Sequence, residues 1–395
     1  MRKLTLIIII VLLPTMMWAQ VRRSTTASKP VTSKNVVKKM NNNYAIVLFD
    51  EVMQNVYEDA TNIYFQGSQY SEQNTLRAID KQTGAIRFVV PKKKRVRTRI
   101  ICSGCDGKNI YMQLEGKGIV LFNGTDVNTS EVFLSEGPID PHTYYLWPAN
   151  RGEAMSFSPN GRFLAMRGDP CVVFDTQTKK VVRMVWRTDC GLVVADDGCF
   201  YAIRENAMWK YPNNGGVHPD LSNKLNDKGI ERFSFEKLTG SFYGEYHGMY
   251  YDSANNAIYL PVRNQLLKFS LDSQEWSEAY AFSNEDRSFT CINYTPSRVF
   301  AHTNDYSKPF YVWGGMDLTG QPQTFDKLNT GIKLGQSPYE SPVEVSLVQS
   351  MYGDSQGNLW LQVSDMQFVV YNPNGIKGFT AMIGKSTRHE IPQEE

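Results

Sequence analysis

"SPNGRFLAMRGDPCVVFDTQTKKVV", residues Ser158–Val182, contains the local pattern that decides the fold. Asn160 and Gly161 supply the backbone freedom of a tight turn, and "RFLAM" and "CVVFD" are short apolar runs of strand length. A second turn, "TQTKK", leads into a further apolar run, "VVRMVW". No part of the stretch has the spacing of an amphipathic helix. The stretch therefore predicts consecutive antiparallel strands joined by tight connections.

The same unit recurs along the chain with a period of roughly 50 residues. Its clearest part is a short run with an apolar or aromatic centre, and a tight turn precedes most of these runs. The seven runs are NIYFQ from Asn62, NIYMQ from Asn109, RFLAM from Arg162, CFYAI from Cys199, AIYLP from Ala257, RVFAH from Arg298 and NLWLQ from Asn358. A third strand follows each run, and usually a fourth. This pattern predicts an all-β fold, a β-propeller with seven four-stranded blades.

Some features of the predicted ring stay open at this stage. The spacing between units is uneven, so six or eight blades are alternatives to seven. "NNNYAIVLFDEV" from Asn41 reads as a strand and is a candidate to close the ring by joining the last blade, which would remove an open edge. The connection from Asn213 to Gly248 is longer than the others, so we expect a surface excursion there.

The chain ends differ in composition from the repeats. Residues 1–19 contain Arg2, Lys3, an apolar run and Ala19, which is the layout of a secretory signal peptide. Its apolar run is shorter than the roughly 20 residues that a membrane-spanning helix needs. Residues 20–43 are basic, with no acidic or aromatic residue, and predict a flexible linker. We assign residues 44–384 to the propeller and 385–395 to a flexible tail.

One stretch points at first to a nucleus. "VVPKKKRVRTRI", residues Val89–Ile100, nearly spells a nuclear import signal. An exported chain does not meet the nuclear import machinery, and the net charge of +2 lacks the footprint of a nucleic-acid-binding domain. In the repeat register, "AIRFVV" is an outer strand and "RTRIICSGCDG" begins the next inner one. The basic residues Lys92, Lys93, Lys94 and Arg95 therefore lie in a connection between blades.

Three segments resemble known propeller repeats. Residues Ser158–Val182 look like the exported Trp-Asp-like repeats, and "NIYFQGSQYSEQNTLRAIDKQTGAIRFVV" from Asn62 looks like a quinoprotein-type repeat. "GDSQGNLWLQVSDMQFVVYNPNG" from Gly353 is similar to the repeats of bacterial periplasmic sensor domains. These resemblances imply a propeller architecture in an exported bacterial protein. They imply no particular activity, because propellers carry many functions.

Candidate binding residues follow from the propeller topology. Connections between blades and loops after each second strand emerge on one face, around the mouth of the central channel. This face would carry the basic connection and an aromatic loop. It would also carry amides at the ends of three of the repeated runs and polar residues at or after three others. The predicted binding residues are Lys92, Lys93, Lys94, Arg95, Gln66, Gln113, Gln362, Tyr144, Tyr145, Trp147, Arg167, Arg204 and His302. Amides and guanidinium groups suit peptide or sugar ligands, and the aromatics suit stacking.

Enzyme signatures are weak. The histidines have no metal-ligand spacing, no serine lies in a nucleophile elbow, and no cofactor motif is present. "CSGC", Cys102–Cys105, has redox spacing but lies between a strand and a turn, which leaves a local disulfide or two inert thiols. Carboxylates at Asp169, Glu205 and Asp305, with His302, are the only set that suggests glycoside chemistry, and their separation is not fixed by sequence.

The sequence thus predicts an exported, non-enzymatic binding or scaffold propeller without a cofactor or metal. The expected location is the periplasm, the cell surface or the medium. The expected partner is a protein, peptide or glycan of the cell envelope, not a nucleic acid, with no stable membrane insertion after signal cleavage. Two alternatives remain: a carbohydrate-active hydrolase or lyase with its site at the channel mouth, and a detached periplasmic sensor module, which would bind a small molecule.

Overall fold

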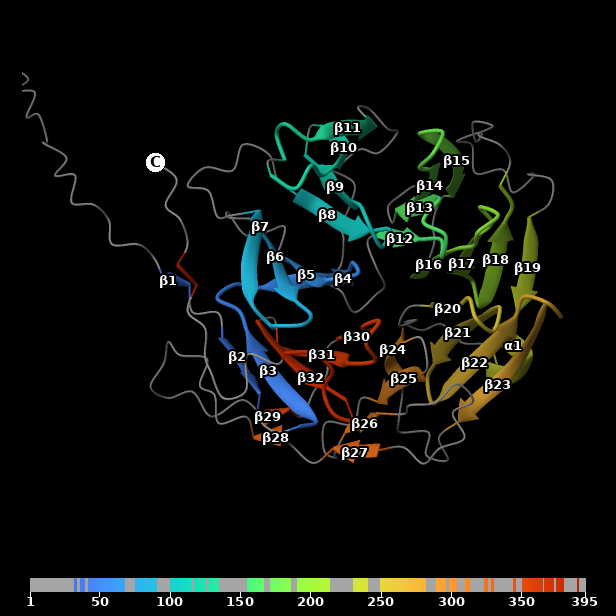
Figure 1. Ribbon diagram of the computed structural model, residues 1–395. Helices are drawn as coiled ribbons and strands as arrows, with labels where there is room; N and C mark the ends of the chain where they lie inside the picture. The colour runs from blue at the N-terminus through green and yellow to red at the C-terminus, as the bar shows by residue number, and fades with distance from the viewer. Residues whose placement is uncertain are drawn as a thin grey trace, which may run out of the picture.

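The computed structural model shows β-sheets arranged as a ring around a central axis (Figure 1). Six sheets have four antiparallel strands each and one sheet has five, so the chain is an all-β β-propeller. The structure describes residues 32–33, 36–39, 42–67, 75–90, 100–115, 117–125, 127–134, 155–166, 171–185, 190–213, 230–240, 249–281, 289–295, 298–303, 310–312, 323–325, 328–329, 344–345, 350–364, 366–372, 374–379 and 389–390.

The first four blades follow one another along the chain. Blade one contains β4 (Met53–Glu58), β5 (Asn62–Gly67), β6 (Leu76–Asp80) and β7 (Ile86–Val90). Blade two contains β8 (Ile100–Cys105), β9 (Ile110–Leu114), β10 (Gly118–Leu121) and β11 (Glu131–Leu134). Blade three contains β12 (Met155–Phe157), β13 (Phe163–Met166), β14 (Cys171–Asp175) and β15 (Lys180–Val185). Blade four contains β16 (Cys190–Val194), β17 (Phe200–Arg204), β18 (Ala207–Tyr211) and β19 (Glu231–Ser234).

The remaining sheets complete the ring. Blade five contains β20 (Tyr250–Asp252), β21 (Ala257–Val262), β22 (Gln265–Ser270) and β23 (Glu275–Ala281), and a short helix, α1 (Glu236–Thr239), precedes it. Blade six contains β24 (Phe289–Thr295), β25 (Arg298–Thr303), β26 (Phe310–Val312) and β27 (Gln323–Phe325). The closing sheet contains, from the inside outwards, β30 (Ser350–Gly353), β31 (Leu359–Ser364), β32 (Gln367–Tyr371), β3 (Tyr44–Leu48) and β2 (Val36–Lys39). Two small pairs join β1 (Thr32–Ser33) to β33 (His389–Glu390) and β28 (Leu328–Asn329) to β29 (Glu344–Val345).

The prediction of seven four-stranded blades is wrong, because the structure has six blades of four strands. The seventh repeated run, NLWLQ, lies in the closing sheet, which takes three strands from the C-terminal part of the chain and two from the N-terminal part. The prediction that the segment from Tyr44 is a strand is confirmed, since β3 pairs with β32. Residues Val36–Lys39 add a fifth strand to it. These four residues belong to the segment 20–43 for which the sequence predicts a flexible linker, and the bounds of that linker stay a prediction.

Aspartates fix several hairpins between the first and second strands. In blade one, Asp59 accepts the backbone N–H groups of Thr61 and Asn62 at 2.7 Å, and the Tyr64 hydroxyl at 2.5 Å. In the closing sheet, Asp354 accepts the backbone N–H of Asn358 at 2.8 Å and the indole N–H of Trp360 at 2.9 Å. Each aspartate satisfies the turn and also anchors an aromatic ring of the next strand.

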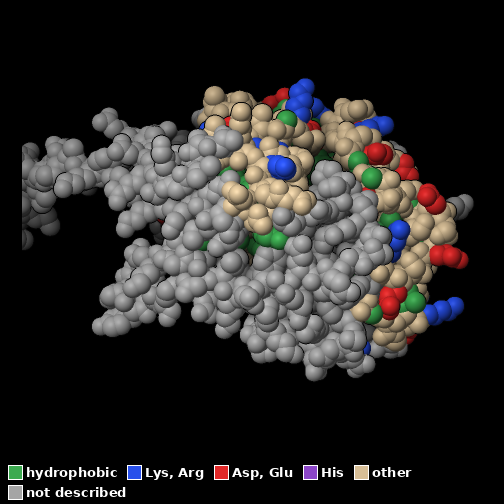
Figure 2. Space-filling model, turned by 60° about the horizontal axis from the view of Figure 1, so that its bottom comes forward, with side chains coloured by type: hydrophobic (Ala, Val, Ile, Leu, Met, Phe, Trp, Pro, Cys, Tyr) green, Lys and Arg blue, Asp and Glu red, His purple; other side chains and the backbone are tan. Residues whose placement is uncertain are grey.

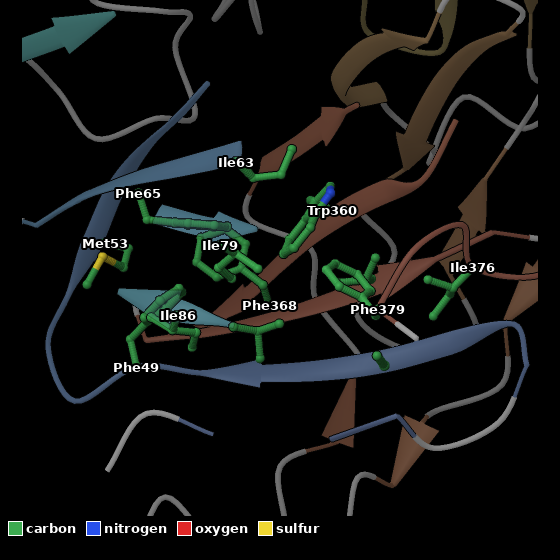
Figure 3. Close-up of a cluster of buried hydrophobic side chains, with 13 residues drawn as sticks. Phe49, Met53, Ile63, Phe65, Ile79, Ile86, Trp360, Phe368, Ile376 and Phe379 are labelled. Atoms are coloured by element: carbon green, nitrogen blue, oxygen red, sulfur yellow. The ribbon is translucent and has the colours of Figure 1, made fainter. Parts of the chain in front are cut away.

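The hydrophobic core lies between neighbouring sheets. Strands such as β5, β9 and β21 are buried along their full length, as expected for blades packed on both faces. Figure 3 shows the cluster between blade one and the closing sheet, where the rings of Phe49, Phe65, Trp360 and Phe368 meet. This cluster joins β5 to β31 and β32, so burial of apolar surface holds the ring closed.

Ion pairs hold the same junction on both sides of the aromatic cluster. On one side, Arg77 lies 2.5 Å from Asp50 and 3.0 Å from Glu51 and is fully buried between the rings of Phe49 and Phe88. On the other side, Lys81 pairs with Glu58 and also donates to the Ser355 hydroxyl at 3.0 Å. The junction is therefore fastened by charges at both ends and by apolar packing in the middle.

Candidate functional site

The strand order gives the ring two different faces. Connections from the fourth strand of one blade to the first strand of the next, and from the second to the third strand within a blade, leave on one face, which we call the loop face. The other two connections of each blade form the opposite face, which we call the turn face. Of the predicted binding residues that the structure describes, Arg204 lies at the loop-face end of β17, and Gln66, Gln113 and Gln362 lie within β5, β9 and β31.

The turn face consists largely of short turns that bond to one another. Glu58 of blade one accepts the backbone N–H of Ser355 in the closing sheet at 2.8 Å. Asp196 of blade four accepts the backbone N–H of Asn160 in blade three at 2.9 Å. Asp175 lies 2.8 Å from Arg162 within blade three. These three carboxylates thus hold turns and neighbouring blades together.

Most of the predicted loop-face residues lie outside the described residues. These are Lys92, Lys93, Lys94, Arg95, Tyr144, Tyr145, Trp147, Arg167, Asp169 and Asp305. The backbone of His302 lies in β25 opposite Cys291, and its side chain is outside the described part of the chain. The binding roles of these residues stay predictions.

Two of the three predicted amides connect neighbouring sheets. Gln66 is fully buried, and its amide donates to the backbone oxygens of Ile101 at 3.3 Å and Ile100 at 3.5 Å in blade two. The Ser103 hydroxyl donates to Gln66 Oε1 at 2.6 Å. Gln362 of the closing sheet donates to the Met53 oxygen of blade one at 3.0 Å. Equivalent positions in the repeat thus make equivalent bonds to the inner strand of the next blade.

The third amide makes a bond within its own blade. Gln113 is buried, and its Oε1 accepts from the Cys102 thiol at 3.3 Å. The described contacts of all three amides are therefore internal, although a ligand-binding role for them stays a prediction. A residue on an inner strand can contact the neighbouring blade as easily as the channel, and sequence position alone does not distinguish these directions.

Of the three arginines among the predicted site residues, the structure describes Arg204, which lies at the loop-face end of β17. Glu205 and Asn206 alone connect it to β18, with left-handed φ angles of 52° and 56°. Glu205 Oε1 accepts from Arg204 Nε at 3.3 Å and lies 3.2 Å from Arg204 Nη2. The Arg204 side chain is 23% exposed and that of Glu205 is 66% exposed, so the pair lies at the protein surface.

Two further residues complete this group, which we call the blade-four cluster: Arg204, Glu205, Trp209 and Arg232. Trp209 donates its indole N–H to the Arg204 backbone oxygen at 3.1 Å. Arg232 lies opposite Trp209 in the β18–β19 pair, with its guanidinium 5.9 Å from the indole centroid. Arg232 Nη2 donates to the Glu205 backbone oxygen at 3.5 Å. Two arginines therefore meet at one hairpin and contact the same glutamate.

A third arginine lies behind the cluster, in blade three. Arg183 of β15 is buried, and its guanidinium lies 5.5 Å from the centroid of the Tyr211 ring. Burial raises the pKa of Tyr211 to about 12, while the positive charges of Arg204 and Arg183 oppose that rise. Arg183 and Arg204 therefore both act electrostatically on the Tyr211 hydroxyl.

Sequence analysis identified Arg204 and Glu205 but missed Trp209, Arg232 and Arg183. Trp209 follows the hairpin in "RENAMWK", and its position two residues into the third strand was a usable signal. Arg232 reaches the site only through the β18–β19 register, across a long connection that gives no register in the sequence. Arg183 arrives from the outermost strand of another blade.

The paired cysteines do not form a disulfide. Cys102 and Cys105 are both free thiols. Cys102 packs in the cluster between blades two and three, whereas Cys105 packs against the cluster between blades one and two, so the two side chains leave β8 on opposite faces. Burial raises the pKa of each thiol to about 12. Of the two possibilities left by the sequence, the structure has two free thiols, with Cys102 buried and Cys105 partly buried.

Within the part of the chain that the structure describes, no group of three or more His, Cys, Asp or Glu side chains has an arrangement that could hold a metal ion. No helix among the described residues is long and apolar enough to cross a membrane. Of the three carboxylates considered for glycoside chemistry, only Glu205 is described, and it pairs with Arg204.

Comparisons with known proteins concern the fold. No family model and no curated protein matches the chain. The extracellular domain of BT4673 from B. thetaiotaomicron is similar, with 13% sequence identity and a TM-score of 0.49. The similarity covers 86% of this chain but only 40% of the BT4673 domain. The WD40 β-propeller domain of Doa1 is similar with 10% identity and a TM-score of 0.49, over 87% of this chain and 96% of that chain.

A third similar structure is that of YCF48 bound to D1 peptide, with 10% identity and a TM-score of 0.49, over 85% of this chain and 97% of that chain. Identities and TM-scores this low give no information on function. The strand pairing by itself identifies the chain as a β-propeller.

Proposed function

We propose that this chain is an exported, non-enzymatic binding propeller that presents its loop face to a protein or peptide partner in the cell envelope. The observation that carries the proposal is the difference between the two faces. On the turn face, Glu58, Asp175 and Asp196 bond to their own turns or to neighbouring blades. On the loop face, the blade-four cluster places the exposed Arg232 on the partly buried Trp209 indole, beside Arg204, which is 23% exposed, and Glu205, which is 66% exposed.

Arginine beside tryptophan is a chemistry that suits protein contacts, because both residue types are enriched among the side chains that dominate binding energy. We propose that two further connections contribute to the same face. One is the basic connection at Lys92–Arg95, and the other is the aromatic connection at Tyr144–Trp147. Export is proposed from residues 1–19, whose composition is that of a signal peptide.

A rigid ring supports this role. Gln66, Gln362 and the ion pairs at the junction of blade one fix the inner strands relative to one another. A preorganised surface loses less conformational freedom when it binds, which raises affinity without new contacts. The ring would therefore act as a platform, with specificity supplied by the connections on its loop face.

The test is capture of envelope proteins by the full chain and by two variants of matched charge. The loop-face variant changes Lys92, Lys93, Lys94 and Arg95 to Ser. The turn-face variant changes the exposed Lys108, Lys179 and Lys180 and the half-exposed Arg162 to Ser. A partner that, once purified, binds the wild type and the turn-face variant but not the loop-face variant supports the proposal. Equal binding to both variants, or turnover of a saccharide by the wild type, contradicts it.

A further inference from the structure

We infer that Arg204 and Arg232 form a binding site for an acidic residue of a peptide partner, and that Glu205 of this chain occupies the site until the partner displaces it. This inference deepens the proposed function, on which it rests, by naming the chemistry that the loop face recognises.

The arginine pair has the composition of an anion site. Arg204 and Arg232 bring two positive charges to the β17–β18 hairpin, where both contact Glu205. Glu205 is the carboxylate that pairs with Arg204 there, and Lys210 and Glu231 on the same strand pair neutralise each other at 2.9 Å. The local charge is therefore positive, and an arginine fork binds a carboxylate through paired hydrogen bonds.

Glu205 is held in a way that allows it to be displaced. Both contacts from Arg204 converge on one carboxylate oxygen, Oε1, at 3.3 and 3.2 Å, and the side chain is 66% exposed. A pair this exposed is weak because solvent screens it. Its φ of 52° is uncommon for a residue other than Gly, Asn or Asp, so the hairpin does not favour glutamate on conformational grounds. The side chain swings away without disturbing a packed core.

The contacts of Glu205 indicate a peptide as the ligand. Its carboxylate accepts from Arg204, and its backbone oxygen accepts from Arg232 Nη2 at 3.5 Å. A carboxylate together with a main-chain carbonyl is what an acidic residue of a peptide offers. Trp209 donates to the Arg204 backbone at 3.1 Å, which fixes the position of the hairpin relative to β18. The site is thus positioned by the sheet and occupied by a residue that resembles its ligand.

The test measures binding of a fluorescently labelled hexaglutamate peptide to the full chain by polarisation at low salt, with hexaglutamine as the reference probe. Glu205→Gln keeps the size of the side chain but removes the competing charge, so we expect about two- to five-fold tighter binding. Arg204→Gln should weaken binding by about ten-fold, because a charge-assisted bond is lost. Arg232→Gln should also weaken binding.

The matched control is Glu131→Gln, which removes an exposed carboxylate that pairs with Lys179 on blades two and three. It should leave hexaglutamate affinity unchanged. Melting temperatures of all variants establish that the ring is intact, and Arg232→Gln serves if Arg204→Gln fails to fold. Hexaglutamate binding that Glu205→Gln does not strengthen, or that neither arginine change weakens, overturns the inference, as does the absence of binding.

The outcomes separate this inference from the proposed function. A captured envelope partner that depends on the loop face but is insensitive to Arg204→Gln, together with no hexaglutamate effect, overturns the acidic-residue site and leaves the binding propeller standing. Hexaglutamate binding with the predicted variant pattern, but with no envelope partner captured by the full chain, supports the site and contradicts the broader proposal.

Discussion

Single side chains at the junction of blade one show how this ring tolerates buried charge. Arg77 is enclosed by Phe49 and Phe88 and meets both Asp50 and Glu51. Burial lowers the pKa of Arg77, and the two carboxylates oppose that shift. Removing one member of a buried ion pair destabilises a protein more than replacing the whole group with apolar residues, because the remaining charge is left uncompensated inside the protein.

We therefore expect Arg77→Met to lower the free energy of unfolding by about 3–5 kcal/mol. The measurement is urea denaturation at neutral pH. Arg87→Met is the matched control, since Arg87 is an exposed residue of the adjacent strand with one contact to Asn62 at 3.5 Å, and it should change stability little. Equal destabilisation by the two changes would show that the buried ion pairs do not matter.

A turn aspartate gives a prediction of pH dependence. Bonds from the backbone N–H and the hydroxyl of Thr83 lower the pKa of Asp80 in the folded state. A carboxyl whose pKa is lower when folded adds stability above its unfolded pKa, and that stability is lost as the pH falls through the folded pKa. The Asp80 contribution is therefore present at neutral pH and absent in strong acid.

Asp80→Asn should accordingly lower the urea midpoint at pH 7, and the difference from the wild type should shrink as the pH is lowered below about 4. Chemical denaturation of both proteins across this range is the measurement. A difference that stays constant or grows in acid would contradict the assignment of the stabilisation to the ionised carboxylate.

At the scale of strands, the closing sheet is the feature that sequence reasoning described least well. The repeat predicts hairpins accurately in blades one to five, because turn residues and apolar runs are local signals. The repeat does not show that Val36–Lys39 pairs with β3, because "VVKK" lies in a basic segment outside the repeats. The position of β3 is itself set by its pairing with β32, which lies near the other end of the chain.

The site was predictable only in part, for a related reason. Arg204 and Glu205 adjoin a repeated run, so alignment of the repeats finds them. Arg232 and Arg183 come from outer strands whose register depends on connections of irregular length. The directions of Gln66 and Gln362, towards the next blade, depend on bulges and on blade packing that composition does not reveal.

The closing sheet makes a prediction about truncation. Deleting residues 1–40 removes β1 and β2 but leaves β3 paired with β32, so the ring should stay folded with a modestly lower melting temperature. Deleting residues 1–49 also removes β3 and Phe49, which exposes the β32 edge and part of the core cluster in Figure 3.

The longer deletion should therefore aggregate or melt far below the shorter one, as measured by size-exclusion chromatography and thermal unfolding. Similar melting temperatures for the two truncated proteins would mean that β3 does not close the ring.

At the scale of the whole molecule, the described rim has little that favours non-specific association. Among the described residues, the exposed large hydrophobic side chains are Val52, Val132 and Leu238. Figure 2 shows acidic and basic side chains interspersed along the described rim. Exposed charges also lie on the outer strands, at Arg87 on β7 and Glu278 on β23, which discourages edge-to-edge pairing. Specific binding is therefore expected at the loop-face ends of the blades, such as the hairpin that carries Arg204 and Glu205, and not along the edges of the outer strands.

The measurement that tests the loop-face account most directly is hydrogen–deuterium exchange of the full chain with and without its purified envelope partner. The account predicts slower exchange in peptides covering 91–99 and 204–207, on the loop face, and unchanged exchange in peptides covering 80–85 and 175–180, on the turn face. Protection confined to the turn-face peptides would contradict it, because the partner would then bind the opposite side of the ring.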